Sequence, residues 1–278
     1  MSQMVSLTVD GRRVSVPAGT MLREACRAAG ETPPALCWHE HLTPANACRA
    51  CVVQVHDSRA LVAACSRPVA EDMVVETNTP RVLNARKIIA ELLASAIDPQ
   101  RAPDLLELVQ ATGADVGRFG GATPRVEPVK DDNPFFVRDY SQCILCYRCV
   151  EACGVDAQNT FAISAAGRGV SARIDAAYDR TLPESDCVFC GNCVAVCPTG
   201  ALIDRQEWQL RSQAVWDPAR ITTTETVCSF CGVGCTLSLQ VMDNRIVKVT
   251  SPHDNPVTHG MLCVKGRYGY AYVQAGDP

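Results

Sequence analysis

The stretch CILCYRCVEAC, residues 143–153, has the same cysteine spacing as CVFCGNCVAVC, residues 187–197. Both read C-x2-C-x2-C-x3-C, so this region carries an internal duplication, and Pro198 follows the second copy. Three cysteines at two-residue gaps suit a cubane cluster, because a tight loop can point each thiolate at a different iron atom. A tetrahedral zinc site uses only four ligands and gives no reason for two such arrays. The duplication therefore predicts two [4Fe–4S] clusters.

The duplicated motif resembles that of two-cluster bacterial ferredoxins, in which the fourth cysteine of each run ligates the other cluster. The resemblance implies that one cluster is held by Cys143, Cys146, Cys149 and Cys197. It implies that the other is held by Cys187, Cys190, Cys193 and Cys153. Such crossing would tie the two halves of the region together.

A second group of cysteines lies nearer the N-terminus with the spacing C-x10-C-x2-C-x13-C, and it consists of Cys37, Cys48, Cys51 and Cys65. Before it, Asp10-Gly11 between alternating apolar residues predicts a β-hairpin, and residues 20–29 predict a helix with Leu22 and Cys26 on one face. Hairpin, helix and cysteine loop together resemble the β-grasp of [2Fe–2S] ferredoxins, in the long-gap variant of complex I, NAD-linked hydrogenases and formate dehydrogenases. Zinc is the alternative, because C-x2-C pairs also build zinc sites.

The chain has 17 cysteines, and only Cys26 lies outside the four groups of four. A lone cysteine on the apolar face of a helix behaves as a small apolar side chain. We therefore expect Cys26 to be a buried packing residue rather than a metal ligand.

The last group reads C-x2-C-x3-C-x27-C and consists of Cys228, Cys231, Cys235 and Cys263. We expect Gly232 and Gly234 to let the backbone turn closely around a cluster, because glycine tolerates the positive φ of such loops. Alternating apolar residues on both sides of Asp243-Asn244 predict a hairpin inside the long gap. The spacing predicts one more [4Fe–4S] site, again with zinc as the alternative.

In order, the three cysteine-rich regions and the Lys265-Gly266 pair resemble the N-terminal part of the alpha subunit of a molybdenum- or tungsten-dependent formate dehydrogenase, a molybdopterin oxidoreductase. The resemblance covers essentially the whole chain. It implies one [2Fe–2S] and three [4Fe–4S] clusters, and it implies that Lys265 lies between the Cys228 cluster and a bis-molybdopterin guanine dinucleotide (bis-MGD) cofactor carrying molybdenum or tungsten. The other interpretation of Lys265 is a solvated loop cation.

The chain departs in one respect from the NAD-linked members of that family, which carry a His-x3-Cys-x2-Cys-x5-Cys cluster after a helix. The helix is predicted, with Thr79 as N-cap, Pro80 as first residue and a helical period kept by Val82, Ala85, Ile89, Leu92 and Ala96. Residues 66–142 nevertheless contain neither histidine nor cysteine. That cluster cannot form, so the [2Fe–2S] centre must reach its neighbours by a shorter route or serve a different electron partner.

The resemblance stops at Pro278, where the pterin-binding and catalytic domains of the family would begin. The family's catalytic residues lie beyond that point, so no catalytic residue is assigned in this chain. We expect a truncated product or a separately encoded subunit. Its expected partners are a pterin-binding catalytic domain or subunit and a flavin/NAD or other electron-accepting subunit.

The cysteine groups predict an α+β chain with three cluster-bearing modules. These are a [2Fe–2S] β-grasp ferredoxin domain at residues 1–78, a two-[4Fe–4S] bacterial-ferredoxin-like domain at 134–207 and a small molybdopterin-oxidoreductase-type [4Fe–4S] domain at 221–278. Residues 79–133 are expected to form a helical segment and linker, with a stretch rich in Gly, Pro and charge at 113–134, and residues 208–220 a partly helical linker.

Charge and hydropathy exclude several classes of partner. The 26 basic and 30 acidic residues give a formal charge of −4 and no reason to expect binding to nucleic acid or an anionic membrane. The most apolar run, residues 88–97, is far shorter than the ~20 residues of a membrane helix, and Met1–Val9 lacks the apolar region of a secretion signal. So many thiols in a long chain without such a signal indicate metal sites in the cytoplasm rather than disulfides.

Each cysteine group already supplies four thiolates, so we expect hydrogen-bonding or surface roles for His39, His41, His56, His253 and His259. The sequence therefore predicts an electron relay belonging to a formate dehydrogenase. An alternative in the same class is the iron–sulfur subunit of an NAD-reducing hydrogenase or of a complex I-like enzyme. An alternative of another class is a zinc-bound assembly or interaction module, which metal analysis would distinguish.

Overall fold

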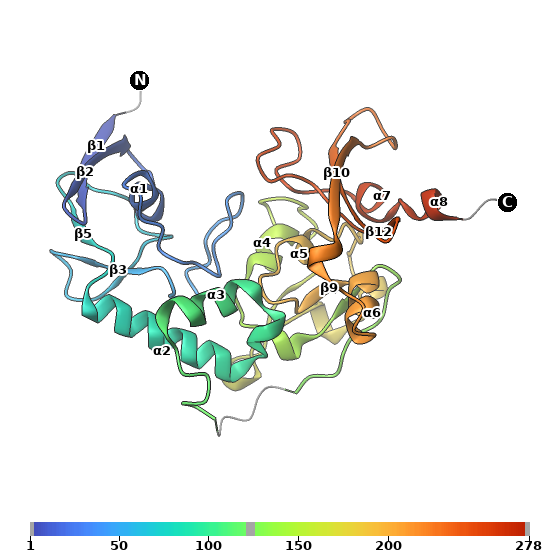
Figure 1. Ribbon diagram of the computed structural model, residues 1–278, viewed down its shortest axis with the longest axis horizontal. Coiled ribbons are helices and arrows are strands. Elements are labelled where there is room, and N and C mark those ends of the chain that lie inside the picture. Colours follow the sequence, from blue (N-terminus) through green and yellow to red (C-terminus); the bar gives the residue numbers. More distant parts are fainter. Residues whose placement is uncertain (1–2, 121–125, 276–278) are drawn as a thin grey trace. The chain divides into compact units, whose positions relative to one another are not determined.

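The computed structural model describes residues 3–120 and 126–275. It divides into two compact units, drawn as ribbons in Figure 1. The first unit comprises Met1–Trp38, Pro44–Arg125 and Ile144–Cys146, and the second comprises His39–Thr43, Val126–Cys143 and Tyr147–Pro278. Both units contain helices and strands, which confirms the predicted α+β class.

A five-stranded sheet with the strand order β2-β1-β5-β3-β4 forms the base of the first unit. Its strands are β1 (Met4–Val9), β2 (Arg12–Pro17), β3 (Val52–Val55), β4 (Val62–Ala63) and β5 (Val74–Glu76). The predicted hairpin joins β1 and β2, and its turn residues Asp10 and Gly11 both have positive φ, at 46° and 79°, as a type I′ turn requires. Strand β1 also pairs in parallel with β5, which gives the mixed sheet expected of a β-grasp.

Helix α1 (Leu22–Ala28) packs its apolar side onto this sheet. The side chains of Leu22 and Cys26 are fully buried and belong to the same apolar cluster as Leu7 and Val9 of β1. Cys26 is thus a buried core residue, as the sequence predicts.

The predicted helix after the sheet is α2 (Pro80–Ala96), and the Thr79 side chain accepts a hydrogen bond from the Val82 N–H at 3.3 Å as its N-cap. Its buried side is not the one that the apolar period predicts, because Leu92 and Ala96 are exposed while Arg86 and Glu91 are buried. Buried charged groups with partners can replace apolar ones. Here Arg86 donates to the Val52 carbonyl at 2.8 Å and Glu91 accepts from Arg118 at 2.8 Å.

Two further elements follow within the segment expected to be helix and linker, namely a 3-10 helix η1 (Pro99–Arg101) and helix α3 (Pro103–Thr112). Helix α3 lies beside α2 (Figure 1). It ends at Gly113, which has the left-handed φ of 59° typical of a helix C-terminus. The expected linker at 113–134 includes residues 121–125, which lie outside the described residues.

The first half of the second unit consists of short elements around the duplicated cysteine motif. Its strands and helices are β6 (Phe136–Arg138), α4 (Arg148–Cys153), β7 (Ser164–Ala166), β8 (Arg173–Asp175), α5 (Asn192–Ala195) and β9 (Leu202–Asp204). Its 3-10 helices are η2 (Tyr140–Gln142), η3 (Gly169–Ser171), η4 (Ala177–Asp179) and η5 (Leu182–Glu184). Strand β6 pairs with β9 and strand β7 with β8, both antiparallel. Strands β6 and β9 therefore join the two ends of the duplicated region.

The second half contains a three-stranded sheet with the order β10-β11-β12, made of β10 (Thr222–Val227), β11 (Thr236–Met242) and β12 (Arg245–Thr250). The remaining elements are α6 (Arg205–Ser212), the 3-10 helix η6 (Pro218–Arg220), α7 (Val264–Tyr268) and α8 (Ala271–Gln274). The predicted hairpin joins β11 and β12, and Asp243 and Asn244 have φ of 52° and 59°. Strand β10 was not predicted, and all six of its side chains are exposed. No helix in the described ranges is long and apolar enough to cross a membrane.

Candidate iron–sulfur sites

The four cysteines of the long-gap loop lie together in the core of the first unit, and all four are at most 8% exposed: Cys37, Cys48, Cys51 and Cys65. Hydrogen bonds from the thiols of Cys48 and Cys65 lower the pKa of Cys37 to about 2. The contact with Cys37, and then that with Cys51, raises the pKa of Cys65. The four thiols are linked in a row by these contacts, and one of them favours the thiolate. Four cysteine sulfurs close together form the donor set that a [2Fe–2S] cluster uses.

The loop around Cys37 also directs backbone donors at its sulfur. The N–H groups of Cys48 and Ala47 both hydrogen-bond to the Cys37 thiol, which favours its anionic form. Such N–H to sulfur bonds tune cluster potentials. All 17 cysteines of the chain are thiols rather than disulfide halves, so the sulfur atoms remain able to bind metal.

The second unit contains a small, mostly apolar cavity of about 20 Å³ that is lined by Cys153, Cys187, Cys190 and Cys193. Apolar side chains such as Phe136, Ile163 and Leu182 form much of the remaining wall. The cavity thus brings the last cysteine of the first run together with the first three of the second run. Four thiols around one mostly apolar cavity match the four-cysteine ligand set of a [4Fe–4S] cluster.

Hydrogen bonds reach two of these sulfur atoms from loops of the same unit. The Ala162 N–H donates to the Cys153 sulfur at 3.2 Å, and the Thr160 hydroxyl lies 3.4 Å from it. The Phe189 N–H contacts the Cys187 sulfur at 3.4 Å. Burial raises the thiol pKa of Cys187, Cys190 and Cys193, so stable thiolates at these positions need compensating positive charge.

The other cysteines of the duplication are divided between the two units. Cys146 is buried in the apolar cluster of the first unit, whereas Cys143, Cys149 and Cys197 belong to the second. The backbone of the two runs is nonetheless alike, because the residue after the second cysteine is left-handed in both, at Tyr147 (φ 63°) and Gly191 (φ 73°). The internal duplication is therefore present in conformation as well as in sequence.

The last cysteine group lies at one end of the three-stranded sheet. The Cys228 N–H donates to the Cys235 carbonyl at 2.8 Å. Burial, followed by the negative charges of Cys228, Cys231 and Cys263, raises the pKa of Cys235, so the four sulfurs are electrostatic neighbours. Gly234 has the expected positive φ of 65°. The expectation for Gly232 was wrong, because its backbone does not adopt a positive φ.

The rim of this group faces solvent. Cys231 and Cys263 are exposed, and so is Lys265 in helix α7. Large apolar side chains around them are exposed as well, namely Val227, Phe230, Val233, Tyr272 and Val273. An exposed patch of this kind next to a metal-binding motif is typical of a surface that another domain or subunit covers.

Four histidines gather in the second unit, although they come from two segments far apart in the sequence. The rings of His39 and His253 lie 4.8 Å apart and those of His41 and His259 lie 4.6 Å apart, while the His41 ring donates to the His253 carbonyl at 2.6 Å. Burial lowers the pKa of His39 to about 4. No sequence signal indicated this cluster, because nothing local relates residues 39–41 to residues 253–259. Among the described residues, no group of three or more His, Cys, Asp or Glu side chains is arranged to hold a single metal ion.

His56 lies apart from the other four histidines, in the first unit. It is exposed and its ring lies 3.2 Å from the Glu76 carboxylate.

Comparison with known families identifies three domains along the chain. Residues 2–80 match the 2Fe-2S iron-sulfur cluster binding domain, residues 137–201 match the 4Fe-4S dicluster domain, and residues 221–275 match the molybdopterin oxidoreductase Fe4S4 domain. The three matched regions contain all sixteen grouped cysteines.

Curated relatives match almost the whole chain. The alpha subunit of the NADPH-Fe(3+) oxidoreductase of Geobacter sulfurreducens is 34% identical over 99% of this chain, and a subunit of an NADH-quinone oxidoreductase of Rhizobium meliloti is 31% identical over 99%. A Staphylococcus haemolyticus protein described provisionally as a formate dehydrogenase is 28% identical over 99%. The chain spans 32% of the length of each of these relatives.

A solved structure of an NAD+-reducing [NiFe]-hydrogenase in the H2-reduced state is also similar. The match has a TM-score of 0.65 at 25% identity and covers 72% of this chain and 87% of that chain. The chain therefore belongs to the iron–sulfur proteins related to complex I and the molybdopterin oxidoreductases, and it consists of a 2Fe-2S domain, a 4Fe-4S dicluster domain and a molybdopterin oxidoreductase Fe4S4 domain.

Proposed function

We propose that the chain is an electron relay with one [2Fe–2S] and three [4Fe–4S] clusters, working inside a larger oxidoreductase in the cytoplasm. The observation that carries the proposal is the apolar cavity lined by Cys153, Cys187, Cys190 and Cys193. A single tetrahedral zinc site would leave the duplicated array of eight cysteines unexplained. When bound, iron–sulfur clusters exchange single electrons with little movement of their ligands.

The proposed ligands of each cluster follow the four cysteine groups with the crossing typical of two-cluster ferredoxins. The [2Fe–2S] cluster takes Cys37, Cys48, Cys51 and Cys65, and the three [4Fe–4S] clusters take Cys143, Cys146, Cys149 and Cys197, then Cys153, Cys187, Cys190 and Cys193, then Cys228, Cys231, Cys235 and Cys263. The chain's own contribution is to hold these thiolates, keep water out and donate N–H groups to sulfur. The module boundaries proposed above, at 1–78, 134–207 and 221–278, enclose these sets.

A pterin-binding domain or subunit is the proposed cover of the exposed rim around Cys231 and Cys263. Two features of this rim support it: the exposed apolar side chains, and strand β10, whose side chains all face solvent. Exposed Lys265 lies two residues after Cys263 and is proposed to contact a bis-MGD cofactor held by that partner.

Two electron sources are compatible with the relatives. Formate, oxidised at a molybdenum or tungsten pterin site, is favoured by the molybdopterin oxidoreductase Fe4S4 domain and by the provisionally described formate dehydrogenase among the relatives. NADH or NADPH, through a flavin subunit, is favoured by the hydrogenase structure, of which the chain covers 87%, and by the 34% identical NADPH-linked relative. We propose formate as the donor and a nicotinamide-linked subunit as the partner at the other end of the relay.

Metal analysis tests the relay itself. The native chain is purified anaerobically and assayed for iron, acid-labile sulfide and zinc. We expect about 14 iron atoms per chain, from one cluster of two and three clusters of four, and a brown protein. A colourless protein with zinc and without acid-labile sulfide would show that the relay is wrong and that the zinc module is right.

Cluster reduction tests the donor. The native complex that contains this chain is isolated and mixed anaerobically with formate, NADH or NADPH, and bleaching of the visible cluster absorbance is followed. Bleaching by formate within seconds supports the proposed donor. If only NADH or NADPH bleaches the clusters, formate is not the donor and the nicotinamide alternative is correct.

A further inference from the structure

Arg138 and Arg267 are the two largest fully buried side chains among the described residues, with exposures of 0% and 1%. Burying a guanidinium costs free energy unless its charge interacts with an opposite charge or with hydrogen-bond acceptors. Both side chains lie against the cysteine loops of one candidate site, the cavity lined by Cys153, Cys187, Cys190 and Cys193.

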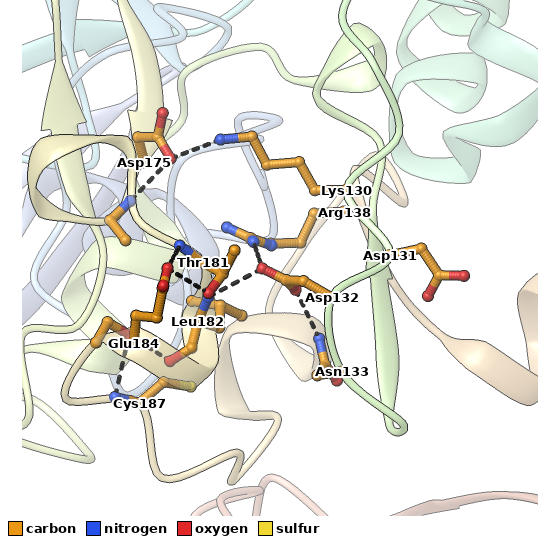
Figure 2. A network of polar contacts seen from close by, with 12 residues as sticks. Lys130, Asp131, Asp132, Asn133, Arg138, Asp175, Thr181, Leu182, Glu184 and Cys187 are labelled. Atoms are coloured by element: carbon orange, nitrogen blue, oxygen red, sulfur yellow. Dashed lines mark hydrogen bonds and ion pairs between the residues drawn. The ribbon is translucent and has the colours of Figure 1, made fainter.

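Arg138 is the last residue of strand β6 and forms part of the cavity wall. One end of its guanidinium pairs with Asp132, whose carboxylate also accepts from the Leu182 N–H at 2.9 Å (Figure 2). Its other two nitrogens, Nε and Nη1, are buried and pair with no carboxylate within the described part of the chain, while the guanidinium also interacts with the buried Tyr140 hydroxyl. The carboxylate thus fixes one side of the group beside the cavity.

Arg267 reaches the same site from helix α7, four residues after Cys263. Its Nε donates to the Cys190 carbonyl at 2.9 Å and its Nη2 donates to the Asn192 side-chain oxygen at 3.0 Å. Neither acceptor carries a charge. The buried carboxylate of Asp204 lies 3.8 Å from the Lys248 ammonium instead. Among the described residues, Arg267 therefore has no carboxylate partner of the kind that Asp132 gives Arg138.

The two guanidinium groups reach the site from different segments. Arg138 lies in the cavity wall together with Cys153, Cys187, Cys190 and Cys193, and Arg267 holds the Cys190 carbonyl. Both positive charges therefore lie in the immediate surroundings of the cysteine loops.

We propose that Arg138 and Arg267 raise the reduction potential of the [4Fe–4S] cluster held by Cys153, Cys187, Cys190 and Cys193. This inference rests on the proposed function. In the step concerned, one electron passes from a neighbouring reduced iron–sulfur centre to this cluster, no bond forms or breaks and no proton moves. The added electron makes the site more negative in a low-dielectric surrounding, where nearby positive charge has its greatest effect.

The position of Arg267 indicates the direction in which the raised potential would move electrons. Cys263, on the same short segment, belongs to the neighbouring [4Fe–4S] group, while the Arg267 guanidinium contacts the loop of Cys190 and Asn192. A cluster of higher potential in the dicluster domain draws electrons from the Cys228 group toward this domain. The two arginines are tuning residues in this scheme, and they do not exchange electrons themselves.

The test is an anaerobic redox titration of the full chain, followed by EPR, with Arg138→Met and Arg267→Gln as charge-removing variants. We expect one [4Fe–4S] component to need a lower potential for half-reduction. The expected change is at least tenfold in the ratio of reduced to oxidised cluster at a fixed potential, which corresponds to about 59 mV for a one-electron couple. Arg138→Lys and Arg267→Lys keep the charge and should recover most of this change.

Arg173→Gln is the matched control, because Arg173 lies in the same domain but is one-third exposed and pairs with Asp175. It should leave every potential unchanged. Asp132→Asn provides a test of opposite sign, since it removes the carboxylate that compensates Arg138 without touching the cavity wall, and it should raise the potential of the same component.

Several outcomes would overturn the inference. If the charge-removing variants keep their iron and show unchanged potentials, the arginines do not tune the cluster, although the relay still stands. If those variants lose the cluster, the sign of the Asp132→Asn shift decides, and a shift that is absent or downward rejects the proposal. A wild-type chain without acid-labile sulfide would instead reject the proposed function.

Discussion

The Arg267 guanidinium donates a hydrogen bond from Nε to the backbone carbonyl of Cys190 at 2.9 Å. Arg267 belongs to the molybdopterin oxidoreductase Fe4S4 domain and Cys190 to the dicluster domain. The contact therefore joins the cysteine loops of two domains within the second unit. The Asn192 side chain strengthens this junction, because its oxygen accepts from both the Arg267 side chain and the Leu262 N–H at 3.0 Å.

Gly191 lies under this junction, and replacing it with alanine should destabilise the second unit. Its φ is 73°, and an added Cβ would lie 2.3 Å from the Tyr268 hydroxyl and 2.5 Å from the Arg267 Cδ. Left-handed strain costs about 1–2 kcal/mol for a residue with a side chain, and overpacking costs about 1–3 kcal/mol more. We expect Gly191→Ala to lower the urea midpoint for loss of visible cluster absorbance accordingly.

Gly169→Ala is the control for strain alone. Gly169 lies in the same unit with a φ of 58°, but an added Cβ would meet nothing within 4 Å. It should cost only about 1–2 kcal/mol. Equal losses in the two variants would mean that the Arg267 and Tyr268 side chains can move aside and that the junction is not tightly packed.

The sequence predicts the local features of the fold well. Asp10-Gly11 and Asp243-Asn244 form the turns expected of them, because a type I′ turn depends on two adjacent residues that tolerate positive φ. The Thr79 cap of α2 is likewise a local feature, because the Thr79 hydroxyl needs only the N–H group three residues later. Helix α3 lies in the segment expected to be helix and linker, but its bounds were not predicted, because that expectation came from a missing motif rather than from the segment's own pattern.

The features that depend on distant parts of the chain were not predictable. The prediction for the buried side of α2 was wrong because Arg118, which lies 27 residues after Glu91 in the sequence, pairs with it and makes its burial favourable. Arg138 and Arg267 carry no motif, and only their position beside the cavity marks them as functional. Gly191 resembles any loop glycine until its neighbours are known; the equivalent position of the first run holds Tyr147.

Removal of Cys153 should eliminate the same cluster as removal of Cys187, because the cavity brings these two thiols together from different runs. We expect Cys153→Ala and Cys187→Ala each to lose about four iron atoms and the same EPR component. The double variant should lose no more than either single one, since one site cannot be lost twice. Iron content and EPR of the anaerobically purified chain provide the measurement.

Cys197→Ala is the companion variant for the crossing. It should remove a different component, and combining it with Cys153→Ala should cost about eight iron atoms. If Cys153→Ala and Cys197→Ala instead remove components from the runs in which they stand, the clusters are not crossed. The ligand sets would then have to be reassigned run by run.

Cys26 should make the first unit less stable at alkaline pH. Burial raises the pKa of its thiol from 9.0 to about 12. Below pH 9 the thiol is protonated in both the folded and the unfolded chain, so stability is unaffected. Between pH 9 and 12 only the unfolded chain loses the proton, and stability falls as pH rises.

The measurement is the urea midpoint of the first unit's unfolding at pH 8 and pH 10, in the wild type and in Cys26→Ala. The variant loses one buried sulfur atom, which costs about 1 kcal/mol at pH 8, and it should lose less stability than the wild type between the two pH values. Its iron content should be unchanged, because Cys26 is not a ligand. A variant with the same pH dependence as the wild type would show that another group is responsible.

Removal of iron should unfold the dicluster region while the β-grasp persists. The strands of that region are three residues long and its helices α4 and α5 are six and four residues long, so little of its backbone is held in regular hydrogen-bonded elements. The first unit has an extensive apolar cluster of its own around the five-stranded sheet. Because metal binding supplies folding free energy to small cluster domains, we expect the chelated chain to be cleaved by protease within residues 134–207 and to remain intact within residues 3–76. Protection of both regions after complete iron removal, with an unchanged circular dichroism spectrum, would contradict this view of the clusters as folding ligands.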